Sequence, residues 1–402
     1  MYQSRHIVDD IYFVGASDRR LSRFENAFPL PDGMSYNSYL VLDEKTVLLD
    51  TVDKSVTKPF FENISHLLGD RKLDYVIINH MEPDHAATLD ELVLRYPEVT
   101  IVGNTKTFAF IKQFFDFSLQ GRMLEVKEGA ELNTGKYSFS FYMAAMVHWP
   151  EVMVTYEKTL GMLFSADAFG TFGALSGNIF ADELNFEHEW LSEARRYYSN
   201  IVGKYGVQVQ ALLNKASGLD IRYLCPLHGP IWRVPKQIVW FIEKYAKWST
   251  YTPEDDDVVI FCASIYGGTE EAANFLASEL AQRKIKHIKM YDIAETDLSY
   301  LVSEAFRAKV LVFASSSYNG GLFARMESLL LDLKAHNLQN RHVAVIENGS
   351  WALSAAKVMN EILSGMKNIT MIGEKISIKS AMREEQANQI RELADAIEKI
   401  LP

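Results

Sequence analysis

Four side chains that can bind a metal lie within the six-residue segment His80-Met81-Glu82-Pro83-Asp84-His85. The apolar, β-branched run at 74–78 predicts a buried strand just before it, and helical apolar spacing begins near Asp84. The segment is therefore expected at the C-terminal end of a strand, where open sheets collect ligand sites. The alternative to a metal site is a solvated turn, in which Asp84 would only cap the helix and the histidines would have no role. Two imidazoles with two carboxylates favour a metal site.

The same arrangement recurs at three later positions, where a β-rich run ends and a metal-capable side chain follows at once. These positions are His148, Asp167 and His228. Each has a structural alternative, because His148 could pack beside Trp149 and Asp167 could cap a turn. Their joint placement at strand ends predicts that they meet the first segment in one metal centre.

Bulk properties limit the class of protein. The chain has 402 residues, 48% of them hydrophobic and 23% charged, which is typical of a soluble protein of two or three domains. A net charge of −11 argues against a nucleic-acid partner. No apolar run approaches the roughly 20 residues of a membrane span, and the N-terminus lacks an apolar signal core. We therefore expect a cytoplasmic protein without membrane association.

The two cysteines, Cys225 and Cys262, lie in apolar strand-like runs and are expected to be core thiols in a reducing compartment. Two cysteines also exclude a built-in rubredoxin or ferredoxin module, which needs four.

A polar, acidic stretch at 249–257 divides the chain into two predicted domains, residues 1–250 and 251–402. The first mixes strands and helices, including a long amphipathic helix over 187–215. The second alternates strands and helices regularly. Its five strands are expected at 258–263, 285–290, 310–314, 342–346 and 369–372. This pattern predicts a doubly wound parallel sheet of flavodoxin size, so the fold class is α/β.

Three polar, glycine-containing segments of the second domain follow predicted strands. The first, between a strand and a helix, suits a monophosphate because helix N-termini and small residues favour anions. The second and third each offer an aromatic ring that could stack on a planar group. Ordinary turns are the alternative, and together the segments favour FMN. Their candidate contacts are Ser264, Ile265, Tyr266, Gly267, Gly268 and Thr269; Ser315, Ser316, Ser317, Tyr318, Asn319 and Gly320; and Asn348, Gly349, Ser350 and Trp351.

With both halves in view, the chain resembles the flavodiiron proteins over essentially its whole length. The resemblance rests on His80-x-Glu82-x-Asp84-His85 followed by His148, Asp167 and His228, and on the stretches 28–38 and 167–174. It implies a metallo-β-lactamase-like αββα sandwich followed by a flavodoxin-like domain. Three positions depart from the family pattern, which commonly has proline where Ser316, Ala324 and Leu353 stand here.

The resemblance also implies an oxo- or hydroxo-bridged diiron centre. Matched positions assign His80, Glu82 and His148 to one iron, Asp84 and His228 to the other, and Asp167 to the bridge. His85 binds metal in some members and is displaced by water in others. The implied reaction reduces O2 to water or nitric oxide to nitrous oxide, with FMN relaying electrons. The implied partners are a separate rubredoxin-like donor or a reduced deazaflavin, and a second copy in a head-to-tail homodimer or homotetramer.

Two other functions remain open at this stage. One is a zinc hydrolase with a regulatory flavodoxin domain, and the other is a flavodoxin-type electron carrier without metal. Glu82 stands where lactamase-like hydrolases have a second histidine, and a carboxylate there favours iron over zinc. O2 and nitric oxide would reach the same open iron positions, so both stay open as substrates.

Overall fold

The computed structural model describes residues 1–401, which form two compact units. The first contains Met1–Tyr198 and Val207–Ala246, and the second contains Ser199–Gly206 and the chain from Lys247 onward. Over these 401 residues, no helix combines the length and apolar character needed to cross a membrane.

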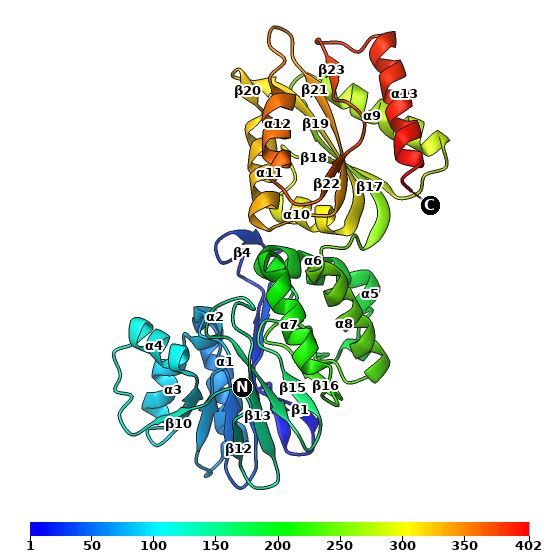
Figure 1. The fold of residues 1–402 in the computed structure, drawn as a ribbon. Helices are drawn as coiled ribbons and strands as arrows, with labels where there is room; N and C mark the ends of the chain where they lie inside the picture. Colours follow the sequence, from blue (N-terminus) through cyan, green and yellow to red (C-terminus); the bar gives the residue numbers. More distant parts are fainter. Residues whose placement is uncertain (402) are drawn as a thin grey trace. The chain divides into compact units, whose positions relative to one another are not determined.

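The first unit contains two main sheets (Figure 1). The first has the order β1 (Arg5–Val8), β2 (Ile11–Phe13), β7 (Tyr39–Val41), β8 (Val47–Leu49), β9 (Tyr75–Ile77), β10 (Thr100–Gly103) and β11 (Met123–Glu125). The second has the order β12 (Glu131–Asn133), β13 (Ser138–Met143), β14 (Met153–Glu157), β15 (Met162–Phe164) and β16 (Tyr223–Cys225). In the second sheet only β15 and β16 pair in parallel.

The main core of this unit lies between the two sheets, because alternate strand residues point toward the facing sheet. Tyr39 and Leu49 from the first sheet join Phe139, Phe141 and Phe164 from the second in one buried cluster. Helices α1 (Thr57–Leu68), α3 (Leu89–Arg95) and α4 (Thr105–Phe114) lie on one side of the sheets, and α7 (Gly206–Ala216) and α8 (Pro235–Ser249) on the other (Figure 1). This four-layer arrangement is the predicted αββα sandwich.

The predicted long helix over 187–215 is wrong, because the segment is broken into short pieces. The pieces are α5 (Phe186–Glu189), α6 (Leu191–Tyr197), a π-helix (Tyr198–Val202), a 3-10 helix (Gly203–Tyr205) and α7. Gly203 and Gly206 are poor helix formers. A Cβ on Gly206 would lie 2.3 Å from the carbonyl oxygen of Ser249. The apolar periodicity of residues 187–215 indicated which side chains are buried, but it did not indicate where the helix is interrupted.

The second unit is built on a parallel sheet of order β18 (Ile288–Asp292), β17 (Asp255–Ala263), β19 (Ala308–Tyr318), β21 (Arg341–Asn348) and β22 (Ile369–Met371). In chain order this is 2-1-3-4-5, the flavodoxin order. Short β20 (Gly321–Leu322) and β23 (Ile376–Ile378) pair with β19 and β21. The predicted fold class is therefore confirmed.

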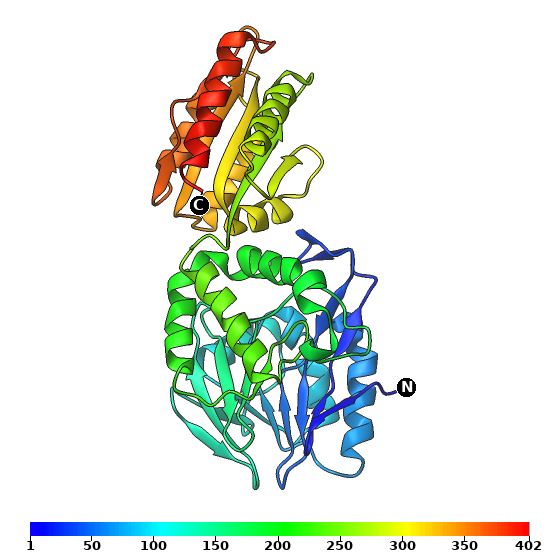
Figure 2. The same cartoon turned by 90° about the vertical axis from the view of Figure 1, so that its right-hand side faces the viewer.

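Helices cover both faces of this sheet. Helices α9 (Gly268–Gln282) and α13 (Glu384–Glu398) lie side by side over one face (Figures 1 and 2). Helices α10 (Leu298–Arg307), α11 (Ala324–Ala335) and α12 (Ala355–Ser364) lie over the other (Figure 1). Residues of α9 and α13, such as Leu276 and Ile390, pack with Ile260 and Val312 of the sheet in one buried cluster. Burial on both faces explains why these strands are continuous apolar runs.

A fully buried arginine holds the start of β21. The Arg341 guanidinium donates hydrogen bonds to the backbone carbonyls of Tyr251, Ala305, Phe306, Gln339 and Asn340. Burial lowers the pKa of Arg341 to about 9. The guanidinium thus links three separate segments of the unit, at Tyr251, at Ala305–Phe306 and at Gln339–Asn340.

We predict that Arg341→Met destabilises the second unit, because several buried carbonyls lose their donor. The free energy of unfolding should fall by about 3 kcal/mol or more, since each unsatisfied buried group costs about 1–3 kcal/mol. Urea unfolding followed by far-UV circular dichroism measures the change. Arg325→Met is the matched control, because the exposed Arg325 donates to one carbonyl, that of Thr296. A loss no larger than that of the control would contradict the prediction.

Candidate metal centre and flavin site

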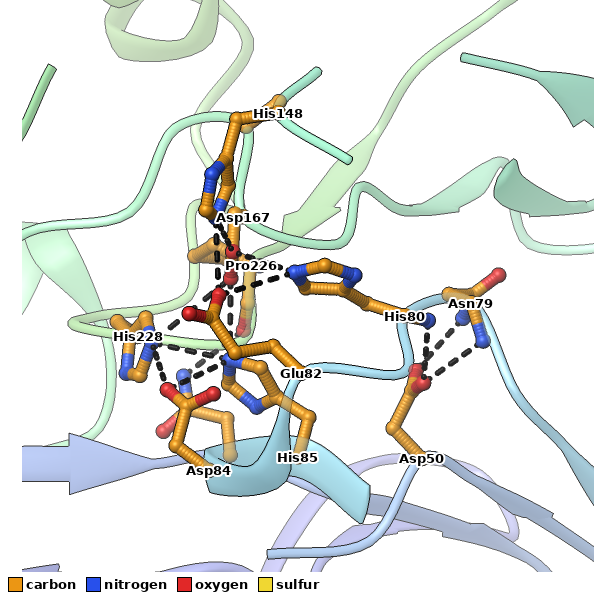
Figure 3. Close-up of polar contacts among 12 residues, drawn as sticks. Asp50, Asn79, His80, Glu82, Asp84, His85, His148, Asp167, Pro226 and His228 are labelled. Carbon is orange, nitrogen blue, oxygen red and sulfur yellow. Dashed lines mark hydrogen bonds and ion pairs between the residues drawn. The ribbon is translucent and has the colours of Figure 1, made fainter. Parts of the chain in front are cut away.

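The seven sequence-predicted metal ligands all meet in the first unit (Figure 3). His80 to His85 follow β9 and enter the short helix α2 (Pro83–Ala86). His148 lies between β13 and β14, Asp167 follows β15, and His228 follows β16. Their potential ligand atoms form two groups, His80 with Glu82, His148 and Asp167, and Asp84 with His85 and His228. Loops at the ends of strands from both sheets thus supply one site.

The carboxylate of Asp167 joins the two groups, because its two oxygens face different ones. Asp167 Oδ2 lies 3.2 Å from His80 Nε2 and 3.1 Å from His148 Nε2. Asp167 Oδ1 lies 3.0 Å from His85 Nε2 and 3.7 Å from His228 Nε2. A carboxylate divided in this way suits a bridge between two cations.

The second group has the geometry of ligands that converge on a common point. Asp84 Oδ2 lies 3.1 Å from Nε2 of both His85 and His228. Neither Asp84 oxygen has a hydrogen-bond partner among residues 1–401. The two Nε2 atoms also face each other at 3.0 Å. Buried polar atoms without partners are costly, and a shared cation would satisfy this set.

Two of the imidazoles are oriented by a hydrogen bond on the nitrogen remote from this point. His80 Nδ1 donates to Glu151 Oε1 at 2.7 Å, and His228 Nδ1 donates to the Ser35 carbonyl at 2.6 Å. These bonds place the proton on Nδ1. In the neutral ring, Nε2 then carries the lone pair that a metal would bind, as is usual for metal-ligating histidines.

The segment after β9 is anchored by a buried carboxylate. Asp50 accepts hydrogen bonds from the backbone N–H and side-chain amide of Asn79, each at 2.7 Å, and from the His80 N–H at 3.2 Å (Figure 3). Burial raises the pKa of Asp50 to about 6 even though these donors favour its ionised form. Thr155 completes the network by donating to Asn79 Oδ1. The segment therefore starts from a fixed backbone.

The segment around His228 requires a glycine. Gly229 has a φ of +79°, and a Cβ there would lie 2.1 Å from Cγ2 of Thr171. Asn37 Nδ2 donates to the carbonyls of Pro226 and Gly229 at 2.9 and 2.8 Å. The glycine allows the close approach, and the amide fixes the backbone on both sides of His228.

The charges in the site stabilise one another. Burial opposes protonation of His85, but Asp84 and Asp167 outweigh it and raise the pKa of His85 to about 10. Burial likewise opposes protonation of His148, while Asp167 and Glu82 raise its pKa to about 9. Burial opposes ionisation of Asp167, but charges on His85 and His80 hold its pKa well below the usual range. The carboxylates thus favour positive charge in the site, here on the imidazoles.

A cavity of about 440 Å³ reaches the two terminal carboxylates of the site, Glu82 and Asp84. Phe24, Glu25 and Tyr36 also line it. Partial burial and the charge on Glu82 raise the pKa of Glu25 to about 8. The cavity therefore gives a small molecule access to Glu82 and Asp84.

In the second unit, the three predicted FMN segments gather at one sheet edge, after or at the ends of β17, β19 and β21. Gly267 has a φ of +89° with open space beside it, and helix α9 begins at Gly268. Ser264 Oγ accepts hydrogen bonds from the N–H groups of Gly267 and Glu270 at 3.1 and 3.3 Å. N–H groups at this helix start are donors that suit a phosphate.

The aromatic side chains of these segments are exposed, Tyr266 by 98%, Trp351 by 83% and Tyr318 by 49%. They are therefore accessible to a planar ring system. The hydroxyls of Thr269 and Ser316 lie 2.8 Å apart and link the first segment to the second.

One predicted boundary in this region is wrong. The third strand of the second domain was expected to end at residue 314, but β19 continues to Tyr318 and turns into β20 through Asn319 and Gly320. The antiparallel pairing of Ser317 and Tyr318 with β20 extends the strand. This pairing depends on a partner strand and leaves no mark in the strand's own sequence.

Sequence reasoning did not identify three residues that act on the site. Glu151 and Asp50 hold the segment that carries His80, and Glu25 lines the cavity beside Glu82. Weak signals existed, because Asp50 ends an apolar run and Glu151 lies three residues after His148. Their partners are distant in sequence, so these signals alone assigned no role.

Comparisons with known proteins agree with this architecture. Residues 34–229 match the family model of the ODP family beta lactamase. The rubredoxin-oxygen oxidoreductase of Megalodesulfovibrio gigas is 30% identical over 99% of this chain and 98% of its own. The nitric oxide reductase of Moorella thermoacetica is 29% identical over 93% and 92%. The solved rubredoxin oxygen:oxidoreductase of Desulfovibrio gigas matches with a TM-score of 0.92 at 29% identity, covering 99% of this chain and 98% of that one.

Fold and site together define a protein that joins a metallo-β-lactamase-like unit, with two groups of side chains that could each hold a metal ion, to a flavodoxin-like unit. With the comparisons, the class becomes specific. The chain belongs to the flavodiiron protein family.

We predict that metal uptake releases protons. Because His85 and His148 hold protons up to about pH 10 and pH 9, a metal ion must displace those protons at pH 7. Metal affinity should therefore rise with pH until the two imidazoles are neutral. The proton release is measured by titrating chelator-stripped protein with Co(II) in a weakly buffered solution that contains a pH-indicator dye. Uptake without proton release, at an affinity independent of pH, would show that the imidazoles are already neutral at pH 7.

Proposed function

We propose that this protein is an FMN- and diiron-dependent reductase of O2 to water, of nitric oxide to nitrous oxide, or of both. The main observation behind this proposal is the position of Asp167, whose two carboxylate oxygens each face a different group of ligand atoms. The printed activities of the M. gigas and Moorella relatives support the same reaction class. The alternatives of a zinc hydrolase and a metal-free electron carrier are not favoured.

The donor set fits two irons. We propose that His80, Glu82 and His148 hold one, that Asp84, His85 and His228 hold the other, and that Asp167 bridges them. Each position then has two imidazoles and one terminal carboxylate besides the shared one. Carboxylates make a harder site than the histidine-rich sites that favour zinc, and they stabilise the ferric state. The position of His85 Nε2, 3.0 Å from Asp167 Oδ1, supports its inclusion.

When bound, the irons and FMN supply electrons, four for O2 to two waters and two for two nitric oxide molecules to nitrous oxide and water. The chain's own residues position and shield this chemistry. Asp50 and Glu151 hold the His80 backbone and ring, and Ser35 orients the ring of His228. The cavity beside Glu82 and Asp84 admits a diatomic molecule.

We propose that residues 1–250 form the diiron domain and residues 251–402 the FMN domain. The phosphate would lie at Ser264–Thr269, where the backbone amides at the start of α9 donate. Tyr318 and Trp351 would flank the ring system, with Ser315–Gly320 and Asn348–Trp351 supplying polar contacts. The exposure of both aromatic rings supports this assignment.

We further propose that a separate rubredoxin-like protein delivers the electrons, as the name of the M. gigas relative indicates for that enzyme. A reduced deazaflavin is the alternative donor. The expected compartment is the cytoplasm. We also propose a head-to-tail homodimer, or a homotetramer made of such dimers, because one repeated symmetric contact can bring each flavin to a metal centre.

The diiron assignment predicts that Asp167→Ala disrupts the metal pair and leaves FMN bound. Without the shared carboxylate, two cations would face each other at short range, a large penalty inside a protein. Wild-type protein from iron-replete cells should hold about two irons and one FMN per chain, from the ligand groups and sheet-edge segments above. The variant should keep the FMN and its reduction but lose iron and nearly all gas consumption.

Asp220→Ala is the control for this experiment, because the Asp220 side chain is 76% exposed and pairs with Arg222. Elemental analysis, flavin absorbance and anaerobic O2 and nitric oxide electrodes give the readouts. Full iron content and turnover in Asp167→Ala would rule out the bridge. If the wild-type protein instead held stoichiometric zinc and showed hydrolase activity without consuming O2 or nitric oxide, the proposed reductase function would be wrong.

Electron transfer between chains is tested by mixing two inactive variants. One carries His148→Ala with His228→Ala, and the other carries Gly267→Asp with Trp351→Ala. Heterodimers should regain one working flavin and metal pair and a fraction of wild-type turnover. No recovery in verified heterodimers, or full turnover by dilute monomer, would overturn the head-to-tail proposal.

A further inference from the structure

Three imidazoles of the site, those of His80, His228 and His85, differ in the hydrogen-bond partner of Nδ1. His80 Nδ1 donates to a carboxylate, Glu151, at 2.7 Å. His228 Nδ1 donates to a neutral carbonyl, that of Ser35, at 2.6 Å. His85 Nδ1 is buried and has no hydrogen-bond partner among residues 1–401. The carboxylate therefore stands behind only one of the two proposed metal positions, the one with His80, Glu82 and His148.

Glu151 is held firmly in this place. Its side chain is completely buried, and Oε1 accepts a second hydrogen bond from the Met81 N–H at 2.9 Å. Asn104 Nδ2 donates to the backbone carbonyl of Glu151 at 2.6 Å. The residue is thus fixed through both its backbone and its side chain. It contacts the His80 ring on the nitrogen opposite to the one that faces Asp167.

In their proposed ligands, the two metal positions are closely matched. Each has one terminal carboxylate, Glu82 or Asp84, and each faces one oxygen of Asp167. A carboxylate that accepts the Nδ1 proton of a ligating histidine raises the basicity of that ligand. A neutral carbonyl accepts the same proton with a weaker effect, because charge-assisted hydrogen bonds are roughly twice as strong.

We propose that Glu151 is a positioning residue that makes the two metal positions unequal. Acting through His80, it makes the position of His80, Glu82 and His148 the tighter cation site and the one that better stabilises Fe(III). With iron bound, oxidation of the diferrous pair by an external one-electron oxidant would therefore remove the electron from the position of His80, Glu82 and His148. This inference rests on the proposed diiron function.

The test separates the charge of Glu151 from its role as an anchor. In Glu151→Gln, the amide oxygen can accept from both His80 Nδ1 and the Met81 N–H, as Oε1 does, so the anchor remains and the charge is lost. Glu151→Leu removes both. Glu157→Gln is the matched control, because Glu157 is also fully buried and accepts two backbone N–H groups, of Thr159 and Leu160.

Each metal position is measured alone by Co(II) titration of chelator-stripped protein. In the His228→Ala background, which leaves the His80-side position, Glu151→Gln should weaken Co(II) binding by about 10- to 100-fold. In the His148→Ala background it should leave the affinity of the other position unchanged. In the ⁵⁷Fe-loaded protein without these alanines, Mössbauer spectra should show Glu151→Gln changing one of the two iron signals, and the potential of the first oxidation should rise.

Three outcomes would overturn the proposal. Equal Co(II) affinities and iron signals with and without Glu151→Gln, together with metal loss in Glu151→Leu, would make Glu151 an anchor only. Equal weakening in both backgrounds would mean that the substitution disturbs the whole site. Equal effects in Glu157→Gln would assign the change to general destabilisation. A wild-type protein that binds no second metal would instead contradict the proposed diiron function, so the two failures are distinguishable.

Discussion

The site depends on the division of one carboxylate between two groups of ligands. Asp167 follows β15, and each of its oxygens lies within 3.2 Å of at least one imidazole nitrogen of a different group. A buried carboxylate at this place is tolerable only with positive charge on both sides. The loops after β9, after β16 and between β13 and β14 must therefore all bring cations or cation ligands toward it. The stacking of the two sheets makes this possible, because strand ends from both meet there.

Buried polar residues hold those strand ends at fixed separations. Asp50 anchors the backbone before His80, Glu151 the ring of His80, and Ser35 and Asn37 the segment of His228. All of them connect loops that are distant in the chain. These contacts fix the loops that carry the proposed metal ligands. Metal binding requires such preorganisation, because ligand atoms must lie within a few tenths of an ångström of their positions.

The flavodoxin-like unit reaches its proposed site by a different route. Its central strands are parallel, so their C-terminal ends lie at one edge of the sheet. The strand direction alone therefore brings the three polar segments together. Hydroxyl contacts such as Thr269 with Ser316 then link the segments. The exposed rings of Tyr266 and Trp351 remain open to a planar ligand.

The sequence alone determined the fold class and the chemical types in both sites. Local patterns were sufficient, because strand and helix periodicity and the residue types at strand ends are properties of short segments. The tertiary structure decided which of these side chains lie together, since Asp84, after a strand of the first sheet, and His228, after a strand of the second, meet only through the packing of the two sheets. It also decided that β19 extends to Tyr318 and that the segment 187–215 is broken. Both depend on contacts with distant residues, as do the partners of Asp50 and Glu151.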